Sequence, residues 1–147
     1  IAHERDERIK RLAGKIDRVL VDAPCSGLGT LRRNPDLKWR QSPQALEELV
    51  AKQTAILESA ARLPKSGGRL VYATCSMLPQ ENEAIAEAFT QAHRDFEPLD
   101  AGELLAQLKV PEAASLCSGG ESGSRFVRLW PHRHQTDGFF AAVWQRK

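Results

Sequence analysis

Three apolar runs predict the strands of this chain. Residues 19–21 are rich in β-branched side chains and end at an Asp-Ala-Pro sequence, which predicts a fully buried strand of a parallel sheet stopped by proline. Residues 69–73 predict a second strand, which runs directly into a Thr-Cys-Ser sequence. Residues 139–144 predict a last strand, at the edge of the sheet or antiparallel to it.

Helical periodicity follows each of the first two strands. Ser42 and Pro43 predict a helix start, with serine as the N-cap and proline in the first turn. A second helix is predicted after Pro79, opened by the acids Glu81 and Glu83. The apolar face of the first helix comprises Leu46, Leu49, Val50, Ile56, Leu57, Ala60 and Ala61. The buried face of the second comprises Ile85, Ala88, Phe89 and Ala92.

The order strand, helix, strand, helix is typical of an α/β domain with a parallel sheet and right-handed crossovers. Polar residues 27–41 predict a loop before the first helix, and residues 117–124 predict a flexible loop. Ligands of open α/β sheets bind beyond the carboxyl ends of the strands, so the chemistry is expected at that edge.

Composition is that of an ordinary globular protein with one domain. The 147 residues are 41% hydrophobic and 27% charged. No stretch approaches the ~18 apolar residues that cross a membrane. The opening sequence IAHERDERIKRLAGK is charged throughout, unlike a signal peptide. We expect a cytoplasmic protein that does not contact membranes, and the sequence leaves the oligomeric state open.

Cys25 and Cys75 each follow a predicted strand end, 50 residues apart. If the two strands are neighbours, their spacing of about 5 Å brings both thiols to one small site. The alternative for each is a small buried hydrophobe, which is the commonest role of a free cysteine. An odd number of cysteines without a Cys-x-x-Cys pair disfavours a disulfide framework, a redox pair and a zinc site, so no metal is expected.

The polar loop concentrates cations around an aromatic residue. The net charge of +2 is too small to indicate nucleic acid by itself. Cations mixed with an aromatic side chain can bind single-stranded RNA through phosphate contacts and base stacking, and a solvated basic loop is an equally good interpretation. The candidate RNA-binding residues are Arg32, Arg33, Lys38, Trp39 and Arg40.

Several segments resemble the RNA cytosine-5 methyltransferases of the NOL1/NOP2/Sun group. They are VDAPCSGLGTLRRNPDLKW (21–39), GGRLVYATCSMLPQENE (67–83) and RLWPHRHQTDGFFAAVW (128–144), together with the separation of the two cysteines. The chain is most similar to the bacterial enzymes that modify small-subunit ribosomal RNA. The resemblance implies a Rossmann-like, S-adenosylmethionine-dependent methyltransferase fold with a mostly parallel sheet and flanking helices. It also implies S-adenosyl-L-methionine as cofactor and RNA, ribosomal above all, as partner.

The resemblance also implies a role for each site residue. Cys75 would be the nucleophile that adds to cytosine carbon 6, so that carbon 5 can attack the methyl group of S-adenosylmethionine. Cys25 would assist removal of the carbon 5 proton and release of the product. DNA cytosine methyltransferases use the Pro-Cys cysteine as nucleophile, which leaves the reverse assignment open. Asp22 would lie in the cofactor site and, with Pro24, beside the cytosine; an Asx-turn is the alternative for Asp22.

A methyltransferase of this group should carry a glycine-rich cofactor loop before the strand at residues 19–21. The 18 residues that precede Val19 contain none. We therefore expect residues 1–147 to be the carboxyl-terminal half of a catalytic domain, without the amino-terminal cofactor-loop strands and RNA-binding domain. Such a fragment would bind the cofactor weakly or not at all, be inactive alone and expose an unpaired strand edge. A non-catalytic α/β RNA-binding module is the second hypothesis, and the paired thiols argue against it.

Overall fold

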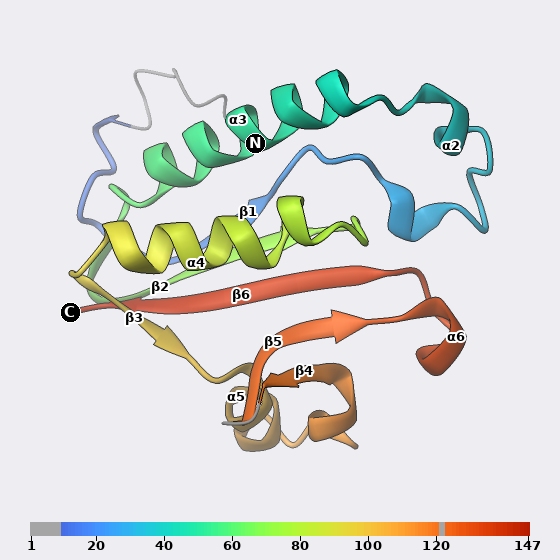
Figure 1. Cartoon of the computed structure of the whole chain (residues 1–147). Helices are drawn as coiled ribbons and strands as arrows, with labels where there is room; N and C mark the ends of the chain where they lie inside the picture. Colours follow the sequence, from blue (N-terminus) through green and yellow to red (C-terminus); the bar gives the residue numbers. More distant parts are fainter. Residues whose placement is uncertain (1–9, 121–122) are drawn as a thin grey trace.

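A computed structural model describes residues 10–120 and 123–147, which form a six-stranded sheet with helices α3 and α4 packed against it (Figure 1). The elements are β1 (Ile16–Asp22), the 3-10 helix η1 (Leu28–Thr30), α2 (Leu37–Arg40), α3 (Pro43–Ala60), β2 (Pro64–Thr74), η2 (Pro79–Glu81), α4 (Glu83–Ala92), β3 (Phe96–Leu99), α5 (Ala101–Gln107), η3 (Ala113–Leu116), β4 (Cys117–Gly120), β5 (Gly123–Leu129), α6 (Pro131–His134) and β6 (Phe139–Arg146).

The two predicted strands β1 and β2 are parallel neighbours, with α3 as the crossover between them. The register pairs Asp22 with Ala73, so both strands end at the same edge of the sheet. The pairs β2–β6, β3–β6, β5–β6 and β4–β5 are antiparallel. The α/β class is confirmed, but the sheet is mixed rather than mostly parallel, because the connections between β4, β5 and β6 are too short for parallel crossovers.

Strand β6 is antiparallel, as predicted, but it lies inside the sheet and not at its edge. It pairs with β2 on one side and with β3 and β5 on the other. Phe140, Ala141 and Ala142 are consecutive and all buried, which is possible only where both faces of a strand are covered. An unbroken apolar run indicates such an internal position better than an edge.

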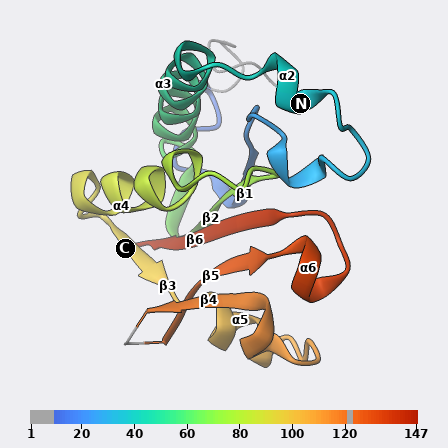
Figure 2. The same ribbon diagram turned by 45° about the vertical axis from the view of Figure 1, so that its right-hand side comes forward.

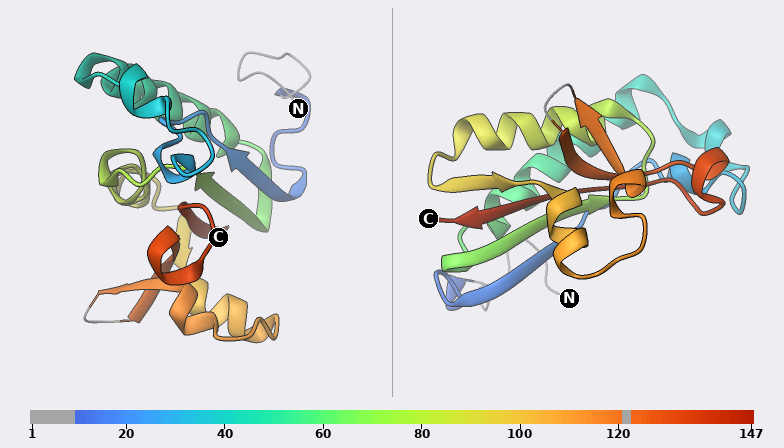
Figure 3. Two further views of the ribbon diagram at one scale, coloured as in Figure 1. Left: turned by 90° about the vertical axis from the view of Figure 1, so that its right-hand side faces the viewer. Right: turned by 90° about the horizontal axis from the view of Figure 1, so that it is seen from below.

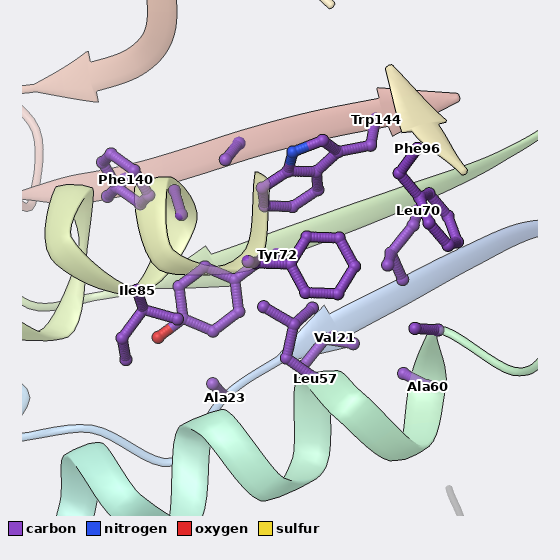
Figure 4. Close-up of a cluster of buried hydrophobic side chains, with 14 residues drawn as sticks. Val21, Ala23, Leu57, Ala60, Leu70, Tyr72, Ile85, Phe96, Phe140 and Trp144 are labelled. Carbon is purple, nitrogen blue, oxygen red and sulfur yellow. The ribbon is translucent and has the colours of Figure 1, made fainter. Parts of the chain in front are cut away.

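The core lies between one face of the sheet and the helices α3 and α4 (Figure 4). Ser42 caps α3 as predicted, since its Oγ accepts a hydrogen bond from the Ala45 N–H at 3.1 Å. Burying each large apolar side chain contributes about 1.5–3 kcal/mol, so this face supplies much of the stability. The cluster includes Val21, Leu57, Leu70, Tyr72, Ile85, Phe89, Phe140 and Trp144.

The opposite face of β1 is open. Leu20 points away from the core and is 68% exposed, so the prediction of a fully buried strand is wrong. Seen from below in Figure 3 (right), α3 lies behind the sheet, and β1 forms the sheet edge next to β2. The unpaired strand edge expected from the sequence is therefore present among the described residues.

The buried face of α4 is displaced by one position from the prediction. Ile85 and Phe89 are buried as expected, but Ala86 is buried with them, while Ala88 and Ala92 are exposed. Alanine is found on both buried and exposed faces of helices, so alanine positions are a poor guide to which face of a helix is buried. Glu81 was expected to open this helix and instead ends η2, fully buried.

Both predicted loops contain regular structure. Residues 27–41 include η1 and α2, and the Gly- and Ser-rich segment 117–124 includes β4 and the start of β5, which pair in antiparallel fashion. Residues 121 and 122 of that segment lie outside the described residues. Small side chains gave no strand signal here, because the pairing comes from the backbone of the neighbouring strand.

Candidate active site

Two cysteine loops meet where β1 and β2 end. Cys25 follows β1 closely and Cys75 follows β2 directly. Their Sγ atoms are 3.4 Å apart, within hydrogen-bonding distance for sulfur. This edge is at the right of Figure 1, comes forward in Figure 2 and faces the viewer in Figure 3 (left). The structure thus brings the two predicted thiols to one place.

The two thiols differ in their protonation. A hydrogen bond from the Cys25 thiol lowers the pKa of Cys75 to about 7. The same contact, together with burial, raises the pKa of Cys25 well above that of an ordinary thiol. Cys75 therefore ionises before Cys25 as the pH rises through 7, and the thiolate is the nucleophilic form of cysteine.

Asp22 and Pro24 lie beside the thiols at the carboxyl end of β1. Both are exposed, and the charge of Asp22 acts to raise the pKa of Cys75, against the effect of Cys25. The Pro24 carbonyl accepts a hydrogen bond from Gln53 Nε2 at 2.9 Å, which ties this loop to α3. An exposed carboxylate at this position can accept hydrogen bonds from the ammonium or hydroxyl groups of a ligand.

A buried carboxylate lies behind the thiols. Glu81 Oε1 accepts hydrogen bonds from the Ser26 N–H at 2.8 Å and from Gln53 Nε2 at 2.9 Å. Its Oε2 accepts from the Ser26 hydroxyl at 2.5 Å and from the Ser76 hydroxyl. Ser26 and Ser76 directly follow Cys25 and Cys75, so one carboxylate contacts both cysteine loops.

Glu81, Gln53 and the two serines were not among the predicted site residues. A usable signal was present, because the dipeptide Cys-Ser occurs twice, and the serines have the same 50-residue separation as the cysteines. Two identical dipeptides at neighbouring strand ends indicate a shared partner for the serines. The partner itself could not be read from the sequence, since Glu81 resembles any acid near a helix start.

Backbone contacts bring the two loops into direct contact. The Gly29 N–H donates to the Cys75 carbonyl at 2.8 Å, and the Gly138 N–H donates to the Gly29 carbonyl at 2.8 Å. A Cβ atom on Gly29 would lie 2.6 Å from the Cys75 carbonyl oxygen and would overlap the Gly138 carbonyl. Only glycine permits this approach of three backbone segments.

The candidate RNA-binding cations lie on the surface next to the cysteine loops, and two of them are paired. Arg33 forms an ion pair with Asp137, and Arg40 forms one with Asp36 at 2.7 Å. Arg32 is exposed as well. The pair of Arg40 with Asp36 is exposed on both sides, and such pairs are worth little, so Arg40 can exchange its partner for a phosphate group at small cost. Asp137 is half-buried, so Arg33 is held more firmly.

Trp39 is 80% exposed, which is unusual for the largest apolar side chain. Lys38 Nζ lies 4.8 Å from the centroid of the Trp39 ring. Gln41, at the end of this segment, donates to the Ser26 carbonyl at 2.9 Å and so ties the segment to the Cys25 loop. The segment that carries the exposed ring and Lys38 is thus tied to the Cys25 loop through Gln41.

Among residues 10–120 and 123–147, no group of three or more His, Cys, Asp or Glu side chains is placed to hold a metal ion. Within the same residues, no helix has the length and apolar character needed to cross a membrane.

The mixed sheet with flanking helices, and two thiols that meet beyond its parallel strands, define an α/β protein with a candidate active site at the strand ends. The family model for the 16S rRNA methyltransferase RsmB/F matches residues 2–145, and the chain belongs to this family.

Named relatives agree with this assignment. The chain is 46% identical over 129 residues to a probable ribosomal RNA small subunit methyltransferase B of Synechocystis, covering 86% of this chain and 26% of the relative. It is 48% identical over 128 residues to the ribosomal RNA small subunit methyltransferase B of Escherichia coli O1:K1, covering 87% and 26%. The crystal structure of NSun6 from Pyrococcus horikoshii with SFG superposes with a TM-score of 0.69 at 27% identity, covering 95% and 32%. The chain thus spans about a quarter of the length of these curated relatives.

Proposed function

We propose that the chain is the carboxyl-terminal part of the catalytic domain of a cytoplasmic RNA cytosine-5 methyltransferase that uses S-adenosylmethionine and acts on small-subunit ribosomal RNA. The family and the names of the relatives support RNA methylation. The observation that carries the cysteine chemistry is the contact of 3.4 Å between Cys25 and Cys75, which leaves the charge on Cys75.

Cys75 is the nucleophile in this proposal. Its thiolate forms a bond to cytosine carbon 6, and the electrons of the carbon 5–carbon 6 double bond move toward carbon 5. Carbon 5 thereby becomes nucleophilic enough to accept a methyl group. A pKa of about 7 leaves a large fraction of Cys75 ionised at neutral pH.

Cys25 acts in the second half of the reaction. Once Cys75 is bonded to carbon, its sulfur no longer carries the negative charge that keeps the Cys25 proton in place. Cys25 can then lose its proton to solvent and take the proton from carbon 5. The electrons of that carbon–hydrogen bond restore the double bond, and the bond between Cys75 and carbon 6 breaks to release the thiolate.

The residues at this edge suit S-adenosylmethionine, which when bound supplies an electrophilic methyl group. The exposed Asp22 carboxylate offers acceptors for ammonium and hydroxyl groups beside the thiols. The Pyrococcus horikoshii structure contains SFG, an analogue of S-adenosylmethionine, which supports this cofactor for the family. Pro24, also exposed, lies where the cytosine would approach.

The RNA would lie along the surface formed by residues 32–40. The exposed Trp39 ring offers a stacking platform, and Arg32, Arg33, Lys38 and Arg40 offer cations for phosphate groups. The attachment of this segment to the Cys25 loop through Gln41 would align a bound strand with the thiols.

The test is a covalent trap. RNA containing 5-fluorocytosine cannot lose the group on carbon 5, so the bond from the nucleophile to carbon 6 persists after methyl transfer. The full-length protein that contains this chain, incubated with this RNA and S-adenosylmethionine, should form an adduct that resists denaturation. Cys75→Ala should abolish the adduct, and Cys25→Ala should retain it and also accumulate adduct on ordinary RNA.

The opposite pattern, with adduct lost in Cys25→Ala and retained in Cys75→Ala, contradicts the assignment of the two thiols. Binding of the RNA without any adduct in the unsubstituted protein would instead favour a non-catalytic RNA-binding module.

A further inference from the structure

Glu81 is a fully buried carboxylate that the proposed chemistry does not use. A buried charge is costly unless hydrogen bonds compensate it, and Glu81 is compensated by groups of the two cysteine loops and by Gln53. Ser26 and Ser76 are themselves fully or almost fully buried, and their hydroxyl oxygens are 3.1 Å apart. The carboxylate therefore determines where the residue after each cysteine can lie.

We propose that Glu81 is a positioning residue, which by binding Ser26 and Ser76 together holds the Sγ atoms of Cys25 and Cys75 within hydrogen-bonding distance. This role rests on the proposed function for its importance, but the geometry that it maintains is a property of the chain alone. Glu81 does not contact the substrate in this proposal.

Other side chains near the site fix one loop each. Asn82 accepts from the Thr74 hydroxyl at 2.5 Å and donates to the Ser76 carbonyl at 3.0 Å, so it fixes the loop of Cys75. Tyr72 donates to the Glu81 carbonyl at 2.6 Å and holds the backbone of η2. Glu81 is the side chain in the described part of the chain that accepts from the residues following both cysteines.

The Glu81 carboxylate makes four hydrogen bonds in this bridge. One oxygen, Oε2, accepts from two hydroxyl groups at once, while the other accepts from two N–H groups. A glutamine at position 81 can keep the bridge, because its NH₂ group can donate to the two serine hydroxyl groups, which also accept hydrogen bonds. An alanine at position 81 removes all four hydrogen bonds and so leaves both loops without this anchor.

The direction of the resulting change at Cys75 distinguishes positioning from simple charge. The groups that face Cys75 are Cys25, Asp22 and Glu81; the hydrogen bond from Cys25 lowers its pKa, and the charges of both acids raise it. Removing the Glu81 charge with unchanged geometry would therefore lower the pKa of Cys75. Separating the thiols would raise it, because the contact with Cys25 has the largest effect.

The experiment measures the alkylation of Cys75 by iodoacetamide as a function of pH, with peptide mass spectrometry to resolve Cys75 from the other cysteines. The unsubstituted chain should show a midpoint near pH 7. Glu81→Ala should raise the midpoint by about one unit, so that the reactive thiolate at pH 6 falls about tenfold. Glu83→Ala is the matched control, since Glu83 pairs with Arg128 instead, and it should leave the midpoint unchanged.

A folded Glu81→Ala variant with an unchanged or lowered midpoint overturns the proposal; circular dichroism shows whether the variant is folded. If Glu81→Ala does not fold, Ser26→Ala and Ser76→Ala carry the test, because each removes one hydroxyl from Glu81. Both should raise the midpoint, and no rise in either overturns the proposal. Alkylation requires no RNA and no methyl donor, so its outcome is independent of the adduct experiment.

Discussion

Two chemically identical side chains, Cys25 and Cys75, acquire opposite properties from a single contact. Each is the largest influence on the other: the hydrogen bond stabilises the thiolate of Cys75 and the thiol of Cys25. A free cysteine of ordinary pKa, about 8.5, would be mostly protonated at neutral pH. The pair therefore provides one thiolate and one proton-bearing thiol side by side.

Replacing Cys25 should make Cys75 an ordinary thiol. In Cys25→Ala the donor that lowers the pKa of Cys75 is lost, while Asp22 and Glu81 continue to raise it. The midpoint of Cys75 alkylation should therefore rise from near pH 7 by at least about one unit, which slows alkylation at pH 6 about tenfold.

Cys117→Ala is the control for this variant, since Cys117 lies in β4 away from the pair, and the midpoint of Cys75 should not change. A midpoint that stays near pH 7 in Cys25→Ala would show that the thiol contact does not set the reactivity of Cys75.

The sequence predicted that the two thiols lie together, but it did not predict the buried residues that hold the two cysteine loops. Cys25 and Cys75 follow recognisable strand ends, so topology alone placed them at one edge. Two partners of Glu81, Ser26 and Gln53, are distant from it in sequence, and nothing local to Glu81 marks it as buried. Pairing of Arg33 with Asp137 likewise depends on loops that meet only in the folded chain.

Helix α3 links the stability of the sheet to the thiol site. Its Leu57 is 1% exposed in the core beneath β1 and β2, and its Gln53, one turn earlier, binds both Pro24 and Glu81. The same helix face therefore has an apolar part that packs and a polar part that anchors the Cys25 loop. The prediction of this helix from its cap and its apolar spacing was correct, because both signals are local.

Shortening Leu57 should destabilise the whole fold. Leu57→Ala removes apolar contacts and leaves a cavity, which lowers the free energy of unfolding by about 2–5 kcal/mol. Leu108→Ala is the matched control, because Leu108 is 70% exposed, and it should change the free energy by less than about 0.5 kcal/mol. Urea unfolding followed by circular dichroism measures both values, and equal losses would contradict the packing described for α3.

The strands show which properties a short stretch of sequence does not determine: the neighbours of a strand and the exposure of its second face. The position of β6 inside the sheet and the pairing of β4 with β5 depend on which strand lies alongside, and composition does not specify this. The exposure of Leu20 depends on what covers the second face of β1, which an apolar run cannot indicate.

At the scale of the whole molecule, the two thiols and the exposed basic segment of residues 32–40 lie on the same side. The carboxyl ends of β1 and β2, helix α2 and helix α6 share the side that faces the viewer in Figure 3 (left). Residues 32–40 follow the Cys25 loop on this side, and Trp39 is 80% exposed. In the proposed function, this arrangement suits a single strand of RNA that presents one base to Cys75.

Removing the exposed indole should weaken RNA binding without altering the thiols. Trp39→Ala loses one stacking surface, worth about 1–3 kcal/mol, so the affinity for single-stranded RNA should fall about 5- to 150-fold. Fluorescence anisotropy at fixed salt measures the affinity, and Leu108→Ala provides the control for loss of an exposed apolar side chain. Unchanged affinity in Trp39→Ala would place the RNA on another surface.

The most direct measurement of the central claim is to identify the residue that is bonded to RNA. The adduct formed on 5-fluorocytosine RNA by the unsubstituted protein can be digested with nuclease and protease and its modified peptide sequenced by mass spectrometry. The account predicts the modified nucleotide on Cys75. A nucleotide on Cys25 would contradict it, since the thiol contact would then favour the opposite sulfur.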